Sequence, residues 1–137
     1  MVNSPRRRIF ISHPYNSERY HSKIVNLLSK KGKLPYFDHS IPQNKKINAG
    51  QRTVNKKIDQ KIRTSSDVII IASNHASHRE NIRKEIKIAK KYNKNIIAVK
   101  PQGQERISKD IRENATTIVG WNRNSINSAI RKNRRKR

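Results

Sequence analysis

Val68-Ile69-Ile70-Ile71-Ala72 is a continuous apolar run, mostly of β-branched residues, with polar residues on both sides. β-Branched side chains favour extended backbone, so the run predicts a strand. A strand with one face in water shows polar and apolar residues in alternation, and this run does not. It therefore predicts a strand buried on both faces, which is typical of parallel sheets in α/β proteins.

Four other apolar segments predict further strands, at Ile9–Ile11, Leu34–Phe37, Ile96–Val99 and Thr116–Val119. Apolar residues at helical spacing predict helices at 17–31, 54–65, 79–92, around 107–111 and at 124–132. Five strands alternating with five helices predict right-handed βαβ units. The expected fold is α/β: a doubly wound, five-stranded parallel sheet with helices on both faces.

The length of 137 residues suits one domain. We expect this domain at residues 8–133, between a basic N-terminal segment at 1–7 and a basic tail at 134–137. No apolar run reaches the length of a membrane span, and the N-terminus lacks the hydrophobic stretch of a signal peptide. The sequence therefore predicts a soluble, cytoplasmic protein with no membrane partner.

Ligands of doubly wound sheets bind beyond the carboxyl ends of the strands, so function is expected there. The segments at these ends are Ser12-His13-Pro14, Asp38-His39, Ser73-Asn74-His75, Lys100-Pro101 and Gly120-Trp121. Most of them carry polar side chains suited to binding a polar substrate. Trp121 is expected to pack as a lid over the last helix.

Glu85 is an unusual residue in a helix whose other charges are nearly all basic. On a helix over 79–92 it lies at the shoulder of an apolar stripe formed by Ile82, Ile86 and Ala89. The positions three and four residues away hold no base, whereas Glu80 has Arg83 and Lys84 at those spacings. Glu85 is therefore either a carboxylate with a chemical role or one that pairs with a base from another loop.

Other kinds of site find little support in the sequence. Cysteine is absent, which excludes disulfides and thiolate zinc sites. His75 and His78 are three residues apart but have no companion ligands nearby, so no metal is expected. Ser12 and His13 are adjacent on a strand end and point apart, which argues against a nucleophile pair. No glycine-rich phosphate loop is present, so a Rossmann mode of dinucleotide binding is not expected.

The chain carries 33 Lys and Arg but only nine Asp and Glu, a formal net charge of +24. Such a charge attracts polyanions, and the basic ends at 6–8 and 131–137 are expected to contact nucleic acid without sequence specificity. Codon bias is the alternative explanation for the abundant Lys, Asn and Ile, but it does not account for the arginines or for the scarcity of acids.

Four stretches of the chain resemble the Toll/interleukin-1 receptor (TIR) superfamily, in its bacterial and archaeal TIR-like branch, which includes the effectors of Thoeris anti-phage systems. These stretches are RRIFISHPYNSERYHSKIVNLL, YFDHSIP, SSDVIIIASNHASHRENIRKEIKIAKKYNKNIIAV and TTIVGWNRNSINSAIRKN. Together they extend from about Arg8 to Asn133. The resemblance implies a flavodoxin-like fold. Many members of the family cleave NAD+ at its nicotinamide–ribose bond and act in defence or signalling.

The resemblance also implies roles for particular residues. Glu85 matches the family's catalytic glutamate, on the helix after the third strand. The end of the first strand contributes to the nicotinamide–ribose pocket in this family, which implies substrate contacts for Phe10, Ser12 and His13. NAD+ is then the substrate, and no cofactor is expected. The loop from Asp38 to Ile47 corresponds to the family's BB loop, which gates the site and mediates self-association.

Three more residues complete the predicted substrate pocket. Tyr15, like Phe10, offers a ring that can stack on nicotinamide. Asp38 and Ser73 lie at the ends of the second and third strands, where a substrate is expected to bind.

Two alternatives remain open at this point. Catalytic members often carry an aromatic residue four positions before the glutamate, and Asn81 stands there in this chain. A non-enzymatic TIR-like interaction module, acting through the 38–47 loop, is therefore the second hypothesis. The third is a protein associated with nucleic acid through its basic surface.

Overall fold

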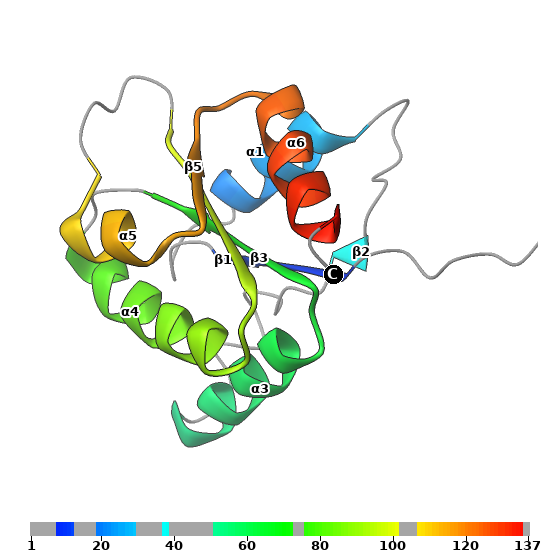
Figure 1. Cartoon of the computed structure of the whole chain (residues 1–137). Helices are drawn as coiled ribbons and strands as arrows, with labels where there is room; N and C mark the ends of the chain where they lie inside the picture. The colour runs from blue at the N-terminus through cyan, green and yellow to red at the C-terminus, as the bar shows by residue number, and fades with distance from the viewer. Residues whose placement is uncertain are drawn as a thin grey trace, which may run out of the picture.

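The computed structural model of the chain describes residues 8–12, 19–29, 37–38, 51–72, 76–101 and 107–135. Strands and helices alternate along these ranges (Figure 1). The strands are β1 (Arg8–Ser12), β2 (Phe37–Asp38), β3 (Asp67–Ile71), β4 (Asn95–Val99) and β5 (Thr117–Val119). The helices are α1 (Arg19–Leu28), α3 (Gln51–Arg63), α4 (Ala76–Lys91), α5 (Lys109–Asn114) and α6 (Arg123–Arg135).

The strands form one parallel sheet in the order β2-β1-β3-β4-β5. β3, the strand predicted from the isoleucine run, is central and pairs with β1 on one side and β4 on the other. β2 contributes only two residues, at the edge beyond β1. The α/β class and the parallel sheet are confirmed, and the strand order is compatible with a flavodoxin-like arrangement.

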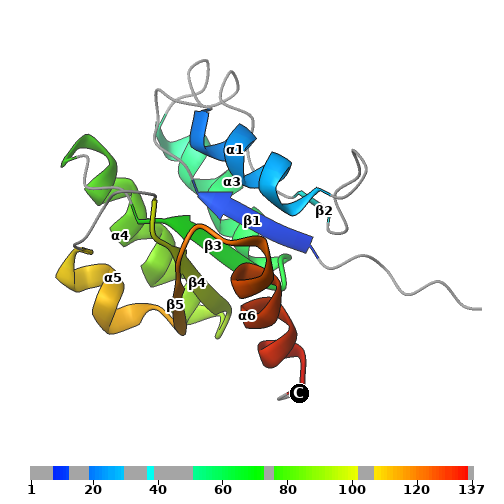
Figure 2. The same cartoon turned by 90° about the horizontal axis from the view of Figure 1, so that it is seen from above.

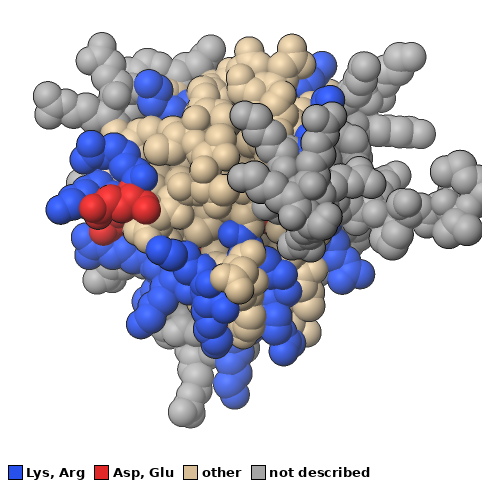
Figure 3. Space-filling model, viewed as in Figure 1, with Lys and Arg blue, Asp and Glu red and all other residues tan. Residues whose placement is uncertain are grey.

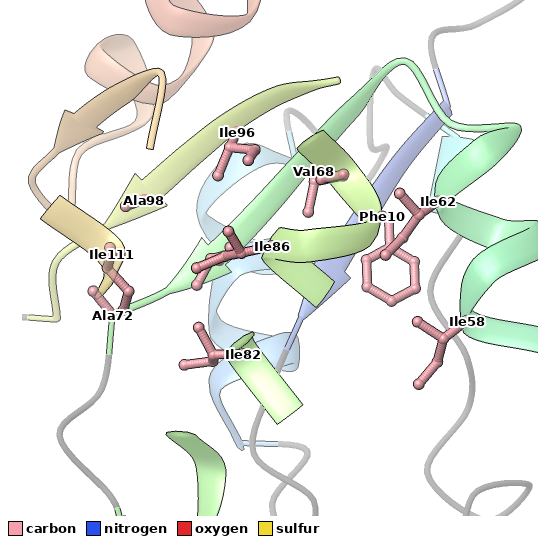
Figure 4. Close-up of a cluster of buried hydrophobic side chains, with 12 residues drawn as sticks. Phe10, Ile58, Ile62, Val68, Ala72, Ile82, Ile86, Ile96, Ala98 and Ile111 are labelled. Carbon is pink, nitrogen blue, oxygen red and sulfur yellow. The ribbon is translucent and has the colours of Figure 1, made fainter. Parts of the chain in front are cut away.

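Helices cover both faces of the sheet, and each face has its own apolar cluster (Figure 2). On one face, Phe10 and the alternate residues of β3 and β4 pack against α3, α4 and α5 (Figure 4). On the other face, Ile9 and Ile11 with the remaining residues of β3 and β4 pack against α1 and α6. Successive side chains of a strand point to opposite faces, so every residue of the continuous runs is buried. Trp121 packs against the second cluster, which includes residues of α6.

The end of α4 is defined by a backbone turn that leads the chain into β4. Asn93 adopts a left-handed conformation, with φ of 54°, which Asn tolerates better than most residues. The amide of Lys94 donates to the carbonyl of Ala89 at 2.8 Å, and that of Asn93 donates to Lys90 at 3.1 Å. This pair of bonds is the Schellman pattern, and it satisfies carbonyls that the last helical turn leaves free. The turn therefore fixes how α4 lies on the sheet.

β3 begins one residue before its predicted start because Asp67 takes part in the sheet. Asp67 and Asn95 are register partners on neighbouring strands, and both are buried. The Asn95 amide donates to Asp67 Oδ1 at 3.0 Å and to the carbonyl of Ala129 at 3.4 Å. These contacts join β3 and β4 to α6 at the amino end of the sheet.

In the described ranges, no helix combines the length and the apolar character needed to span a bilayer.

Candidate active site

Glu85 and Ser12 meet at the carboxyl end of β1. Ser12 is the last residue of β1 and points to the same face as Phe10, two residues earlier, which is the face that α4 covers. Glu85 lies in the middle of α4, next to Ile82, Ile86 and Ala89. The Ser12 hydroxyl donates a hydrogen bond to Glu85 Oε1. The acid is thus held where doubly wound sheets bind their ligands.

Both members of this pair are withdrawn from solvent. Glu85 is 2% exposed and Ser12 is 0% exposed. A buried carboxylate costs free energy unless polar groups replace its lost hydration, and the Ser12 hydroxyl is one such group. The sequence argument that Glu85 lies at the edge of the apolar stripe, and not among the exposed lysines, is confirmed.

Phe10 lies two residues before Ser12 on the same face of β1, in the core. Its side chain is 1% exposed and packs in the cluster with Ile58 and Ile62 of α3 and Ile82 of α4 (Figure 4). The structure therefore assigns Phe10 a packing role in the core. Its predicted contact with substrate stays a prediction.

The other predicted pocket residues lie at or beyond the limits of the described chain. His13, Tyr15 and Ser73 fall outside the described residues, as does most of the 38–47 loop. Asp38 ends β2, and its backbone pairs with that of Ile9 on β1. Asp38 is thus on the strand that borders β1. His75 is also outside the described part, within which no group of three possible metal ligands occurs.

The sequence did not predict two polar features of the structure. The first is the bond between Ser12 and Glu85, which are 73 positions apart. The second is the buried Asp67–Asn95 contact at the opposite end of the sheet. The sequence held one signal of the second feature, since Asp67 and Asn95 each directly precede an apolar strand run.

A cavity of about 280 Å³ also lies at the amino end of the sheet, where Lys90, Asn95 and Thr116 are among its lining residues.

Residues 10–106 match the family model described as Thoeris protein ThsB, TIR-like domain, which is more than half of the chain. The chain belongs to this family. The matched range includes both Ser12 and Glu85. No curated protein matches the sequence of this TIR-like chain.

A solved structure shares the fold of the TIR-like chain. The CMP N-glycosidase BcmB of Clostridium botulinum aligns with a TM-score of 0.55 over 93% of this chain and 99% of that one. The sequence identity is 17%, so the likeness concerns the fold.

Replacement of Ser12 by alanine tests the bond at the centre of this site. We expect Ser12→Ala to lower the free energy of unfolding by about 1–3 kcal/mol, because a buried acceptor loses a donor. In a Glu85→Gln background the same change is expected to cost less, since a neutral amide loses less than a carboxylate does. Urea denaturation of the two single variants and the double variant measures this coupling. Strictly additive effects would contradict a direct interaction.

Proposed function

We propose that this TIR-like chain is an N-glycosidase of nucleotides that cleaves the nicotinamide–ribose bond of NAD+, with Glu85 as its catalytic carboxylate. The observation that supports this proposal is the buried Glu85, hydrogen-bonded to Ser12 at the carboxyl end of β1. Family membership agrees with this position for the reacting group. The proposal includes a flavodoxin-like fold with a sheet of five strands, in which β2 is the edge strand.

The proposed reaction needs a negative charge beside the sugar. When the N-glycosidic bond breaks, its electron pair leaves with nicotinamide, and positive charge develops at C1′ and the ring oxygen of ribose. The Glu85 carboxylate stabilises this charge, in a site where little water screens the interaction. Water then adds to C1′ and gives up a proton, so the products are ADP-ribose, nicotinamide and H+. Attack by a ribose hydroxyl in place of water gives a cyclic product.

In this proposal the remaining predicted residues hold the substrate. Ser12 orients the carboxylate, and His13, Asp38 and Ser73 supply polar contacts at the strand ends. The ring of Tyr15 provides an apolar surface for nicotinamide, and the buried ring of Phe10 packs in the core on the same face of β1 as Ser12. The enzyme acts in the cytoplasm, in defence or signalling, and takes NAD+ as a substrate without a further cofactor.

The name of the structural neighbour supplies a second substrate to test, CMP. The two leaving groups make different demands on the site. Nicotinamide leaves NAD+ as a neutral molecule, so a carboxylate without a proton donor suffices. Cytosine leaves as an anion unless an acid protonates it, so efficient CMP cleavage requires a general acid as well. Glu85 with Ser12 provides the carboxylate, and this favours NAD+.

The test is a chromatographic assay of the full chain with NAD+ and, separately, with CMP, at high protein concentration to favour self-association. We expect nicotinamide and ADP-ribose, or its cyclic form, to appear with NAD+, and less cytosine to appear with CMP. Cytosine release without nicotinamide release would contradict NAD+ as the substrate. Stable NAD+ and CMP at every protein concentration would contradict the proposed activity.

Asn81 favours a second candidate function, a non-enzymatic interaction module. It stands one helical turn before Glu85 on α4, where catalytic relatives often carry an aromatic residue. This candidate predicts self-association or partner binding through residues 38–47 and no loss of NAD+. Sedimentation of the chain with and without substitutions in that loop tests it, and unchanged association would count against it.

A further inference from the structure

The helices α3 and α4 carry a basic surface that the proposed reaction does not use. On α4, Lys84, Lys87 and Lys91 follow one another at the i, i+3 and i+7 positions that share one side of a helix. On α3, Lys56 and Arg63 are seven residues apart and share another such stripe. All five side chains are exposed. We refer to these five residues as the α3–α4 basic face.

Contacts between the two helices place the stripes beside each other. Asp59 lies three residues after Lys56 and four before Arg63 on α3. It accepts a hydrogen bond from the Tyr92 hydroxyl at 2.7 Å and pairs with Lys91 at 3.6 Å. The α3 stripe therefore borders the α4 stripe. Figure 3 shows Lys and Arg gathered over the region where α3 and α4 lie in Figure 1.

Little negative charge offsets this face within the described part of the chain. Asp59 pairs with Lys91, and Asp110 of α5 pairs with Arg83 at 2.7 Å, at the border with α5. Glu85 points inward and is buried. Glu80, four residues before Lys84, is the remaining acid of the two helices. Among the side chains that the structure describes, Lys56 and Lys87 have no acidic partner. Mutual repulsion among the basic residues of the face costs stability that a polyanion would restore.

We propose that the α3–α4 basic face binds the phosphate backbone of nucleic acid without sequence specificity. Lys84 and Lys91 lie about 10 Å apart along α4, a distance over which a duplex presents about six phosphate charges. Four of the five residues are lysines, which act as point charges for phosphates, while arginine reads bases through paired donors. The binding is therefore electrostatic.

The composition of the face favours nucleic acid over a membrane. Helices that bind at bilayer interfaces place large apolar side chains among the acyl chains, beside their basic residues. In the described part of the chain, Ile118 is the large apolar residue that is exposed, and it belongs to β5 and not to α3 or α4. The basic face therefore lacks an apolar component for insertion.

The experiment compares two triple variants of the full chain in binding a labelled DNA duplex of about 20 base pairs. Lys56→Gln/Lys84→Gln/Lys87→Gln removes three charges from the face. Lys23→Gln/Lys109→Gln/Arg112→Gln removes three exposed charges from α1 and α5. Both variants keep the basic ends of the chain, and fluorescence anisotropy between about 50 and 200 mM salt gives the affinity and its salt dependence.

We expect the first variant to bind the duplex at least about tenfold more weakly than the unsubstituted chain. The slope of log K against log salt is expected to fall in magnitude by about 2.7, because each of the three lost phosphate contacts removes about 0.9. The control variant is expected to bind almost as the unsubstituted chain does. Equal weakening of both variants would assign binding to total charge and overturn the proposal. Absence of binding at about 50 mM salt, or tighter binding to phosphatidylserine vesicles than to the duplex, would also overturn it.

Discussion

Glu85→Gln is expected to reduce NAD+ cleavage by about a hundred- to a thousand-fold, the usual effect of removing a group that stabilises transition-state charge. Glutamine has the size of glutamate, and its amide oxygen can still accept the Ser12 hydrogen bond, so packing around α4 is preserved. Only the negative charge opposite the developing cation is lost. The rate of nicotinamide release at saturating NAD+ measures the effect.

A matched control tests whether the loss of activity is specific to Glu85 or follows the removal of any acidic side chain. Glu113 is an exposed glutamate on α5, outside the proposed site. Glu113→Gln is expected to leave the rate within about twofold, since a surface charge of this kind contributes little. Both variants should unfold cooperatively on heating, as the unsubstituted chain is expected to do. Equal turnover by Glu85→Gln and the unsubstituted chain would eliminate Glu85 as the catalytic carboxylate.

The position of Glu85 beside the apolar stripe of α4 and the parallel sheet were both predictable from the sequence because local pattern governs them. The isoleucine run became the central strand β3, since a continuous apolar segment is stable only between two covered faces. Glu85 was singled out because helical spacing placed it beside Ile82 and Ile86, with no base three or four positions away. Burial of α4 on the sheet then made its withdrawal from solvent unavoidable.

The partners of the polar residues were not predictable in the same way. The Ser12–Glu85 bond depends on the register of β1 against β3 and on where α4 crosses the sheet, and both are tertiary properties. The Asp67–Asn95 contact likewise follows from the pairing of β3 with β4. In the sequence, Ser12 and Asp67 are both polar residues next to apolar strand runs, at opposite ends of the sheet. Their hydrogen-bond partners become known only from the way the neighbouring helix or strand packs against them.

Ile97→Ala is expected to cost about 2–5 kcal/mol of unfolding free energy, the largest effect on stability among the changes considered. Ile97 is 0% exposed in β4 and packs in the cluster that joins the sheet to α1 and α6. Removal of its outer carbons loses their transfer free energy and leaves a cavity, because the paired backbone on both sides prevents collapse. A small domain has only about 5–15 kcal/mol of total stability, so much of the variant is expected to unfold at physiological temperature.

Ile118→Ala provides the matched control, because it makes the same chemical change on the adjacent strand. Ile118 pairs with Ala98 and is 42% exposed, so its loss is expected to cost less than about 1 kcal/mol, mostly through strand propensity. Urea denaturation of both variants measures the difference. Similar costs at the two positions would mean that β4 is not enclosed as the structure has it. Because Ile97 faces away from α4, the folded fraction of Ile97→Ala should retain the activity per molecule of the unsubstituted chain, which separates the stability of the sheet from the chemistry of Glu85.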